Sequence, residues 1–177
     1  MIKFQRIATS DTALYDYMEK LMTTSFPPEE YRSLAELRNY TDSKPHFYCN
    51  IILHDDNPIG LITYWDFGHF YYVEHFAIDP SRRNGGHGKN VLSHLCQQIN
   101  KPIILEVEAP EEEMAIRRIN FYKRHGFTLW EKPYMQPPYK PGDGYLPMLL
   151  MAYGNLECEK DFEYVKERIY REIYNVQ

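Results

Sequence analysis

The sequence predicts an α/β fold built on a mixed β-sheet, and three observations lead to that prediction. Some segments repeat apolar residues at helical spacing, whereas others alternate or run continuously apolar in the manner of strands. The predicted elements follow the order β, α, α, β, β, β, α, β, α, β, β, α, with a polar loop before the third helix. Tight turns between neighbouring strands give antiparallel pairs, and a strand–helix–strand crossover gives a parallel pair, so one sheet should contain both.

The first half of the chain is expected to hold two helices followed by a run of strands. Ser10 or Asp11 can cap the first helix, and the stretch Ser25-Phe26-Pro27-Pro28 ends it. Pro28 suits the first position of a second helix, and the polar turn at 54–58 joins two strands into a hairpin. The elements expected here are a strand at 2–8, a helix that ends before residue 25, a helix from Pro28 to about Tyr40, and strands at 47–53, 59–66 and 70–78.

The second half is expected to begin with a glycine-bearing loop at 79–88 and to end in an amphipathic helix. Gly126 is placed to end a helix as its C-cap. A long loop rich in proline and glycine, at 135–145, separates the last two strands. The elements expected here are a helix at 89–99, a strand at 102–107, a helix at 111–125, strands at 127–133 and 146–152, and a helix at 160–174.

Composition disfavours several functional classes. A length of 177 residues suits one domain better than two, and 44% apolar with 25% charged residues argues against disorder. A net charge of −5 disfavours a general nucleic-acid binder. The three cysteines lie far apart and the histidines lack ligand spacing, so we expect no metal. Apolar runs stay far below the ~20 residues of a membrane span, so a cytoplasmic protein without a membrane partner is expected.

The most informative segment joins a predicted strand to a predicted helix through glycines: Phe76-Ala77-Ile78-Asp79-Pro80-Ser81-Arg82-Arg83-Asn84-Gly85-Gly86-His87-Gly88-Lys89. Backbone N–H groups at a helix start attract anions, and glycines let the backbone approach a ligand closely. Together with the three cationic side chains, the segment indicates a phosphate or pyrophosphate site. The residues at 83, 90 and 91 fit neither a P-loop nor a Rossmann fingerprint. A glycine-rich turn that binds no ligand is the alternative.

The motif Arg83-x-x-Gly86-x-Gly88, after a strand that ends in Phe76-Ala77-Ile78, resembles the acetyl-CoA signature of the GNAT acetyltransferases. The stretch Phe121-Tyr122-Lys123-Arg124-His125-Gly126-Phe127 is similar to a second motif of that family. The resemblance covers residues 1–152 and leaves 160–174 as a helical extension of one domain, 1–177. It implies the GNAT fold, a mixed sheet whose central parallel strands splay apart, with acetyl-CoA between the strands at 70–78 and 102–107.

The resemblance also implies which residues contact acetyl-CoA. The pantetheine arm would pair with the backbone of Phe76 and Ile78, and the pyrophosphate would lie on amides of the loop. The family often has Asn and Ala where this chain has Ala115 and Arg118, while an asparagine occurs at 120. The expected contacts are Phe76, Ala77, Ile78, Arg83, Asn84, Gly85, Gly86, His87, Gly88, Lys89 and Asn120.

Direct transfer of an acetyl group to an amine needs a proton acceptor for the amine and benefits from a proton donor for the thiolate. Glu74 is the expected base, because strand alternation places it on one face with Tyr72 and Phe76. Glu106 and Glu108 are second choices, and His75 faces the opposite side as a packed residue. Tyr122 resembles the tyrosine that acts as general acid in the family. Its pKa near 10 exceeds that of a thiol near 8.5, so proton donation is uphill by about 2 kcal/mol.

The acceptor side is expected at the start of the second helix and at the proline-rich loop. Phe26, Glu29 and Glu30 resemble a substrate-side segment of some amine-acetylating members, and Tyr72 and Tyr139 add aromatic walls. The acceptor would be a small-molecule or peptide amine, and a homodimer through the last helix stays open. Two alternatives remain at this stage: a non-catalytic acyl-CoA-binding or sensing domain, and a protein-interaction module with a vestigial loop.

Overall fold

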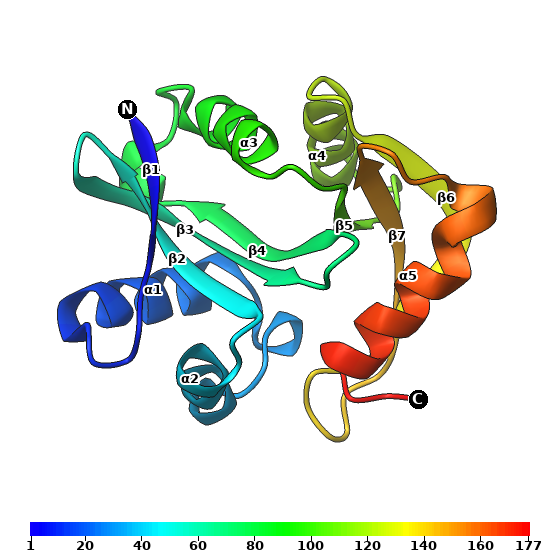
Figure 1. Ribbon diagram of the computed structural model, residues 1–177, viewed down its shortest axis with the longest axis horizontal. Helices are drawn as coiled ribbons and strands as arrows, with labels where there is room; N and C mark the ends of the chain where they lie inside the picture. Colours follow the sequence, from blue (N-terminus) through cyan, green and yellow to red (C-terminus); the bar gives the residue numbers. More distant parts are fainter. The chain divides into compact units, whose positions relative to one another are not determined.

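The computed structural model describes residues 1–177 and contains one seven-stranded sheet with the order β1-β2-β3-β4-β5-β7-β6. Helices flank the strands, so the predicted α/β fold on a mixed sheet is confirmed (Figure 1). Contacts divide the chain into two compact units, residues 1–66 with 73–100 and residues 67–72 with 101–177. The units are described separately below, and the assignment of the whole chain to one domain stays a prediction.

In the first unit, α1 and α2 lie on one side of the strands and α3 lies on the other (Figure 1). The strands β1 and β2 pair antiparallel, as do β2 and β3. Asp55 and Asp56 form the hairpin turn with φ angles of 48° and 63°, which short polar residues tolerate best among non-glycines. The elements are β1 (Ile2–Arg6), α1 (Thr12–Ser25), α2 (Leu34–Ser43), β2 (Phe47–His54), β3 (Asn57–Asp66), β4 (Tyr71–Ile78) and α3 (His87–Gln98), with the first two residues of β4 in the second unit.

The second predicted helix differs from the observed one. Pro28–Glu30 forms only a short 3₁₀ turn, and α2 begins at Leu34. The Ser33 hydroxyl accepts a hydrogen bond from the Glu36 amide at 3.2 Å, so Ser33 caps a new helix. The break between these elements leaves Arg32 outside regular structure, with an exposed side-chain fraction of only 1%.

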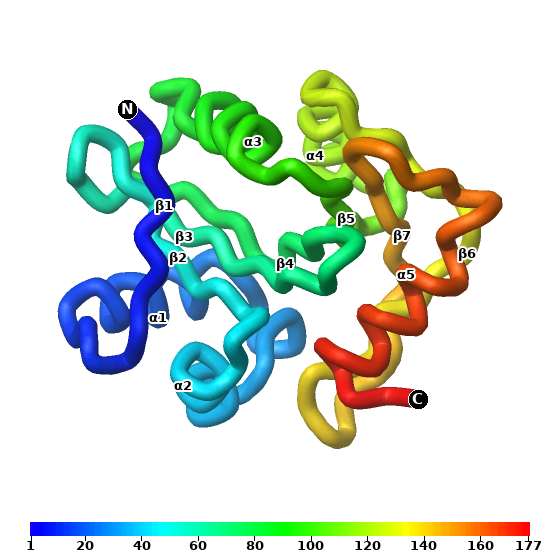
Figure 2. Tube along the Cα trace, in the orientation of Figure 1, coloured from blue at the N-terminus to red at the C-terminus, as the bar shows by residue number.

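In the second unit, β7 lies between β5 and β6 and pairs antiparallel with both. This confirms the predicted final strand pair, although β6 continues to Gln136, beyond the predicted end at 133, after an irregularity between Trp130 and Tyr134. The segment between β6 and β7 and the C-terminal end of α5 lie side by side (Figure 2). The elements are β5 (Ile103–Glu108), α4 (Glu113–Lys123), β6 (Thr128–Gln136), β7 (Leu146–Tyr153) and α5 (Cys158–Glu172).

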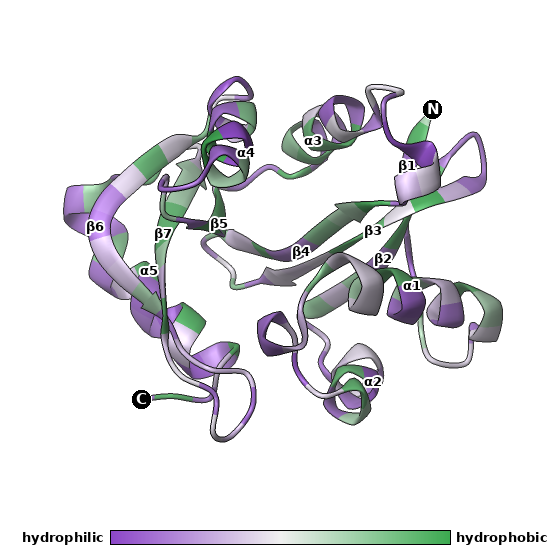
Figure 3. Ribbon diagram, turned by 180° about the vertical axis from the view of Figure 1, so that it is seen from behind, coloured by the Kyte–Doolittle hydropathy of each residue, from purple (hydrophilic) through white to green (hydrophobic).

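Apolar residues concentrate on the strands, whereas the helices alternate between polar and apolar positions along their length (Figure 3). The core of the first unit includes Met18, Ile51 and Leu61, and that of the second includes Ile104 and Val165, all fully buried. None of the helices combines the length and the hydropathy that a membrane span requires.

Gly60 on β3 lies against the end of β4, and we expect Gly60→Ala to destabilise the protein. A Cβ atom there would lie 2.4 Å from the carbonyl oxygen of Ala77 and 3.2 Å from the Cα of Ile78. Because both neighbours are backbone atoms, relief requires a strand to shift, and overpacking of this kind lowers the free energy of unfolding by about 1–3 kcal/mol. In a chain of this size the midpoint of thermal unfolding should fall by roughly 2–10 °C.

Thermal unfolding followed by circular dichroism measures this effect. Gly144→Ala is the matched control, since nothing lies within 4 Å of a Cβ built there. Equal midpoints for the two variants would contradict the close approach of β3 and β4.

Candidate functional site

The loop that follows β4 is anchored at its first residue. The Asp79 amide donates to the Ile59 carbonyl at 2.8 Å, and the Asp79 carboxylate accepts hydrogen bonds from the Ser81 amide and hydroxyl. The Tyr17 hydroxyl of α1 donates to the same carboxylate at 3.1 Å. Hydrogen bonds from Ser81, above all, hold the pKa of Asp79 below its usual value. The loop therefore leaves the sheet in a fixed direction.

The loop then turns through two left-handed residues into α3. Asn84 and Gly86 have φ angles of 68° and 72°, and Gly86 is the N-cap of the helix. The first hydrogen bond inside the helix runs from the Asn90 amide to the Gly86 carbonyl. The amides from His87 to Lys89 come before this bond and have no acceptor within the helix. Free amides at a helix start, close to Arg83, form the arrangement that binds phosphate groups.

His87 shapes the same turn. Its ring lies against Gly85, where a Cβ atom would come within 2.9 Å of Nε2, and its ring centroid is 5.0 Å from that of His54. The Nδ1 atom of His87 is buried without a hydrogen-bond partner. The unsatisfied polar atom fits a ligand with polar oxygens at this turn.

Glu74 on β4 is paired inside the first unit. Arg32 Nη2 lies 2.7 Å from Oε2 and Nη1 lies 3.3 Å from Oε1, while the Trp65 indole donates to Oε1 at 2.7 Å. The Glu74 side chain has an exposed fraction of 0%. Burial acts to raise the pKa of this carboxyl, but the charge of Arg32 above all, together with the hydrogen bonds from Trp65 and Arg32, holds it below the usual value. A carboxylate held in this way is a weak proton acceptor, so these surroundings favour a positioning role over the predicted role of base.

His75, the next residue on β4, is buried and faces the turn before α2. Its Nε2 lies 2.8 Å from the Glu30 carbonyl oxygen, and its ring makes an edge contact with Phe26 at 4.8 Å. Burial lowers the pKa of His75, so the neutral ring donates from Nε2. The sequence prediction of a packed histidine agrees with this geometry. The same contacts of His75 hold Phe26 and Glu30, two residues of the predicted acceptor side, against β4. Glu29 is exposed.

Tyr122 lies on α4 in the second unit and is almost fully buried. Its ring contacts Phe121 and Phe127, and its carbonyl accepts the amides of His125 and Phe127. Burial raises the pKa of Tyr122 to about 12, with Arg118 acting in the opposite direction. Asn120, two residues earlier, is exposed. The hydroxyl of Tyr122 is therefore a poorer acid than a tyrosine in water.

A second buried carboxylate, Glu106, lies on β5. Its oxygens accept hydrogen bonds from the Tyr134 hydroxyl at 2.8 Å, from Gln136 Nε2 at 2.8 Å, and from the Tyr174 hydroxyl at 2.9 and 3.0 Å. Tyr72 donates to the same carboxyl. We call these five residues the Glu106 cluster. Sequence reasoning ranked Glu106 as a second-choice base and missed Gln136 and Tyr174, which come from segments far away in the chain.

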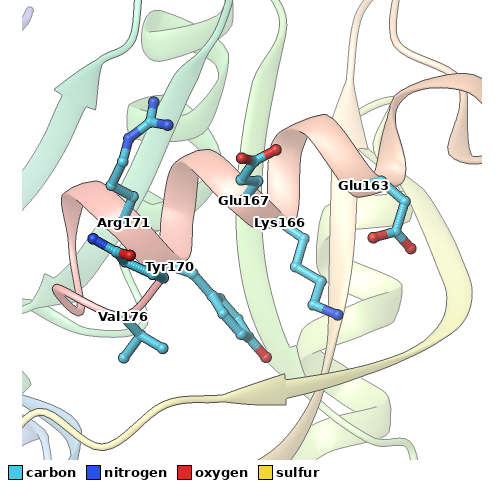
Figure 4. Close-up of a pocket in the computed structure, with 7 residues that line it drawn as sticks. Glu163, Lys166, Glu167, Tyr170, Arg171 and Val176 are labelled. Carbon is cyan, nitrogen blue, oxygen red and sulfur yellow. The ribbon is translucent and has the colours of Figure 1, made fainter.

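The structure also contains a hollow of about 530 Å³ beside α5 and the C-terminal residues (Figure 4). Charged side chains dominate it, and no residue predicted to bind acetyl-CoA or the acceptor lines it. The hollow therefore lies outside the candidate site. Its lining residues are Glu163, Lys166, Glu167, Tyr170, Arg171, Val176 and Gln177.

Comparisons with known proteins agree with this geometry. The model of the acetyltransferase (GNAT) family matches residues 12–127. A GNAT-family protein from Bacteroides thetaiotaomicron is 60% identical, with 99% of each chain covered and a TM-score of 0.97. A ribosomal-protein alanine N-acetyltransferase from Escherichia coli is 19% identical (86% of this chain and 93% of that chain covered, TM-score 0.59). An acetyltransferase from Bacillus subtilis in complex with CoA is 13% identical (88% and 98% covered, TM-score 0.57). No match to this sequence occurs among curated proteins.

Proposed function

Because the chain belongs to the GNAT family of acetyltransferases, we propose that it transfers the acetyl group of acetyl-CoA to a primary amine by direct attack of the amine on the thioester. The amine nitrogen forms a bond to the carbonyl carbon, the bond from that carbon to sulfur breaks, and CoA leaves as a thiolate. As the amide forms, the nitrogen releases one proton to water, and the CoA thiolate, stabilised by a hydrogen-bond donor as it leaves, takes up one proton from water, so the products are an amide and CoA. No covalent intermediate on the protein is required.

The observation that carries this proposal is the anchored turn from β4 into α3. The amides from His87 to Lys89, the side chain of Arg83 and the unsatisfied Nδ1 of His87 would hold the pyrophosphate of acetyl-CoA. The backbone from Phe76 to Ile78 would pair with the pantetheine arm. Further contacts with acetyl-CoA are proposed from the loop, at Asn84, Gly85 and Gly88, and from α4, at Asn120.

Two side chains have proposed parts in the transfer. Tyr122 donates a hydrogen bond to the departing sulfur. Glu74 keeps its negative charge beside Arg32 and holds β4 and the turn before α2 in place, which orients Phe26 and Glu30 for the acceptor. Tyr72 and Tyr139 are the proposed aromatic contacts of the acceptor, and Glu29 offers an exposed negative charge.

Gly86→Ala is expected to weaken acetyl-CoA binding by at least about tenfold. The left-handed conformation at φ 72° disfavours any side chain by about 1–2 kcal/mol, so the turn should reorganise and the amides should lose their common direction. Isothermal titration with acetyl-CoA measures the loss. Gly68→Ala is the matched control, because Gly68 also has a positive φ, of 87°, and open space around its Cβ position.

Two results would contradict the proposal. Unchanged acetyl-CoA affinity in Gly86→Ala would remove the turn from the binding site. Acetyl-CoA binding by the wild type with no release of CoA, across a panel of alkylamines, polyamines and lysine peptides, would contradict the transfer of acetyl groups to such amines.

A further inference from the structure

The loop between β4 and α3 is fixed by hydrogen bonds only at its two ends, both of which belong to the first unit. Residues 81–86 are all exposed. No amide from Asn84 to Gly86 donates a hydrogen bond within the chain, and α3 begins at His87. The direction in which the amides of the loop point therefore depends on how the loop is held where it leaves β4.

Asp79 holds that end of the loop. Its amide donates to the Ile59 carbonyl on β3 at 2.8 Å, and its own carbonyl accepts the Arg82 amide at 2.8 Å. Its Oδ1 atom accepts the Ser81 amide at 2.9 Å and the Ser81 hydroxyl at 2.8 Å. These contacts join Asp79 to the neighbouring strand and to the turn that follows, and none of them uses the second carboxylate oxygen.

Tyr17 supplies the partner of that second oxygen. Its hydroxyl donates to Oδ2 of Asp79 at 3.1 Å, from a position on α1 that is 62 residues earlier in the chain. Burial above all, followed by the charge of Asp79, raises the pKa of Tyr17, so the hydroxyl keeps its proton. A hydrogen bond to an ionised acceptor is stronger than one between neutral groups. The bond therefore ties the start of the loop to a helix that packs on the other side of the sheet.

This tie bears on phosphate binding. Several amides bind one pyrophosphate well only while they share a direction, and a binding site has to be held within about 0.5 Å of its productive geometry. Without the Tyr17 hydroxyl, the Asp79 carboxylate keeps only its contacts to Ser81, inside the same turn. The start of the loop should then move more freely, while β4 and α3 keep their own hydrogen bonds.

We propose that Tyr17 is a positioning residue for the pyrophosphate of acetyl-CoA and that it acts through Asp79. The inference rests on the proposed use of acetyl-CoA. It adds a residue of α1, far from the loop in sequence, to those that select acetyl-CoA over an acetyl donor without a pyrophosphate. No step of the transfer itself is assigned to Tyr17.

Tyr17→Phe removes the hydroxyl and keeps the ring. Isothermal titration should show acetyl-CoA bound about three- to tenfold more weakly, the usual effect of losing one hydrogen bond. Steady-state kinetics should show a raised KM for acetyl-CoA at an unchanged kcat. Tyr48→Phe is the matched control and should change neither value, because Tyr48 is also half-buried in the first unit and its hydroxyl makes no hydrogen bond.

A shorter acetyl donor separates positioning from packing. S-acetylpantetheine has the same thioester and pantetheine arm as acetyl-CoA but lacks the pyrophosphate and the nucleotide. Tyr17→Phe should leave kcat/KM for this donor unchanged, since the donor has no group for the loop to hold. Equal losses with the two donors would assign Tyr17 to the packing of α1 and would overturn the proposal.

Replacing Asp79 tests whether Tyr17 acts through it. Asp79→Ala should weaken acetyl-CoA binding more than Tyr17→Phe does, because it also removes the contacts to Ser81. The double variant should bind acetyl-CoA no more weakly than Asp79→Ala alone, since residues that act as a unit are not additive. Losses that add in the double variant would contradict the role of Asp79.

The outcomes distinguish this inference from the proposed function. If Tyr17→Phe weakens acetyl-CoA binding only while Asp79 is present, and no amine is acetylated, the proposed transfer fails and the role of Tyr17 stands. If the wild type acetylates an amine and Tyr17→Phe binds acetyl-CoA as tightly as the wild type, the transfer stands and the role of Tyr17 is wrong. A wild type that binds no acetyl-CoA would overturn both.

Discussion

Replacing Arg32 with methionine is expected to lower the free energy of unfolding by about 3–5 kcal/mol, the usual effect of removing one partner of a buried ion pair. Arg32 and Glu74 have exposed side-chain fractions of 1% and 0%, so neither charge can turn to water when its partner is lost. The guanidinium also lies over the Tyr40 ring at 4.7 Å, a contact that methionine keeps only as packing. For a chain of this length the thermal midpoint should fall by roughly 6–20 °C.

Chemical denaturation and thermal unfolding measure this loss. Arg117→Met is the matched control, because Arg117 forms its ion pair with Glu113 at the surface, where both side chains are more than two-thirds exposed. Such pairs contribute at most about 1 kcal/mol. The double variant Arg32→Met with Glu74→Gln should recover much of the stability, since it leaves no unpaired charge. A double variant no more stable than Arg32→Met would show that packing of the arginine, rather than its charge, stabilises the fold.

The same pair gives a pH dependence with a definite sign. The pKa of Glu74 is lowered in the folded protein, so the ion pair contributes stability above the ordinary carboxyl value of 4.5, and the contribution is lost as the pH falls through the lower folded pKa. In Arg32→Met the unpaired carboxyl is protonated more easily. The difference in stability between wild type and Arg32→Met should therefore be largest near neutral pH and should shrink in acid.

The element order could be predicted because each element has a local signal. Helical spacing of apolar residues, the proline at 28 and the glycine at 126 mark real boundaries or lie close to them. The predicted start of the second helix, at Pro28, was wrong by six residues. Both Pro28 and Ser33 suit the start of a helix, and the longer helix begins after the cap at Ser33. A capping sequence, Ser33-x-x-Glu36, was the signal that could have placed this boundary.

One part of the candidate site could likewise be predicted from a local segment of the sequence, whereas another part depends on residues far apart in the chain. The turn into α3 is contiguous in sequence, so its glycines and cations could be recognised by spacing alone. The partners of the two buried carboxylates are not contiguous: Arg32 lies 42 residues from Glu74, and Tyr174 lies 68 residues from Glu106. No local pattern marks Arg32, which lies in a break between two helical segments. The charge state of a carboxylate depends on such partners, so sequence alone could rank Glu74 above Glu106 as a base but could not show that Arg32 pairs with Glu74.

Tyr122→Phe is expected to lower kcat by about 100- to 1,000-fold, the effect of losing one well-placed donor to a developing negative charge, with the Kd for acetyl-CoA nearly unchanged. Burial raises the pKa of Tyr122 to about 12, whereas a thiol has a pKa near 8.5, so full proton transfer to the sulfur is uphill by about 5 kcal/mol. We therefore expect the hydroxyl to act as a hydrogen-bond donor to the thiolate in the transition state rather than as a full proton donor.

Steady-state kinetics and acetyl-CoA titration distinguish this role from the others. A donor that acts only in the transition state lowers kcat and kcat/KM together, while one that holds the ground state raises KM alone. Tyr153→Phe is the matched control, because its ring also packs on Phe127, at 5.3 Å, and it has no proposed part in the reaction. A lower thermal midpoint in step with the lower kcat would assign Tyr122 to packing of α4. An unchanged kcat with a raised KM would assign it to binding, because a hydroxyl that mattered to the leaving sulfur could not be removed without slowing the step in which that sulfur departs.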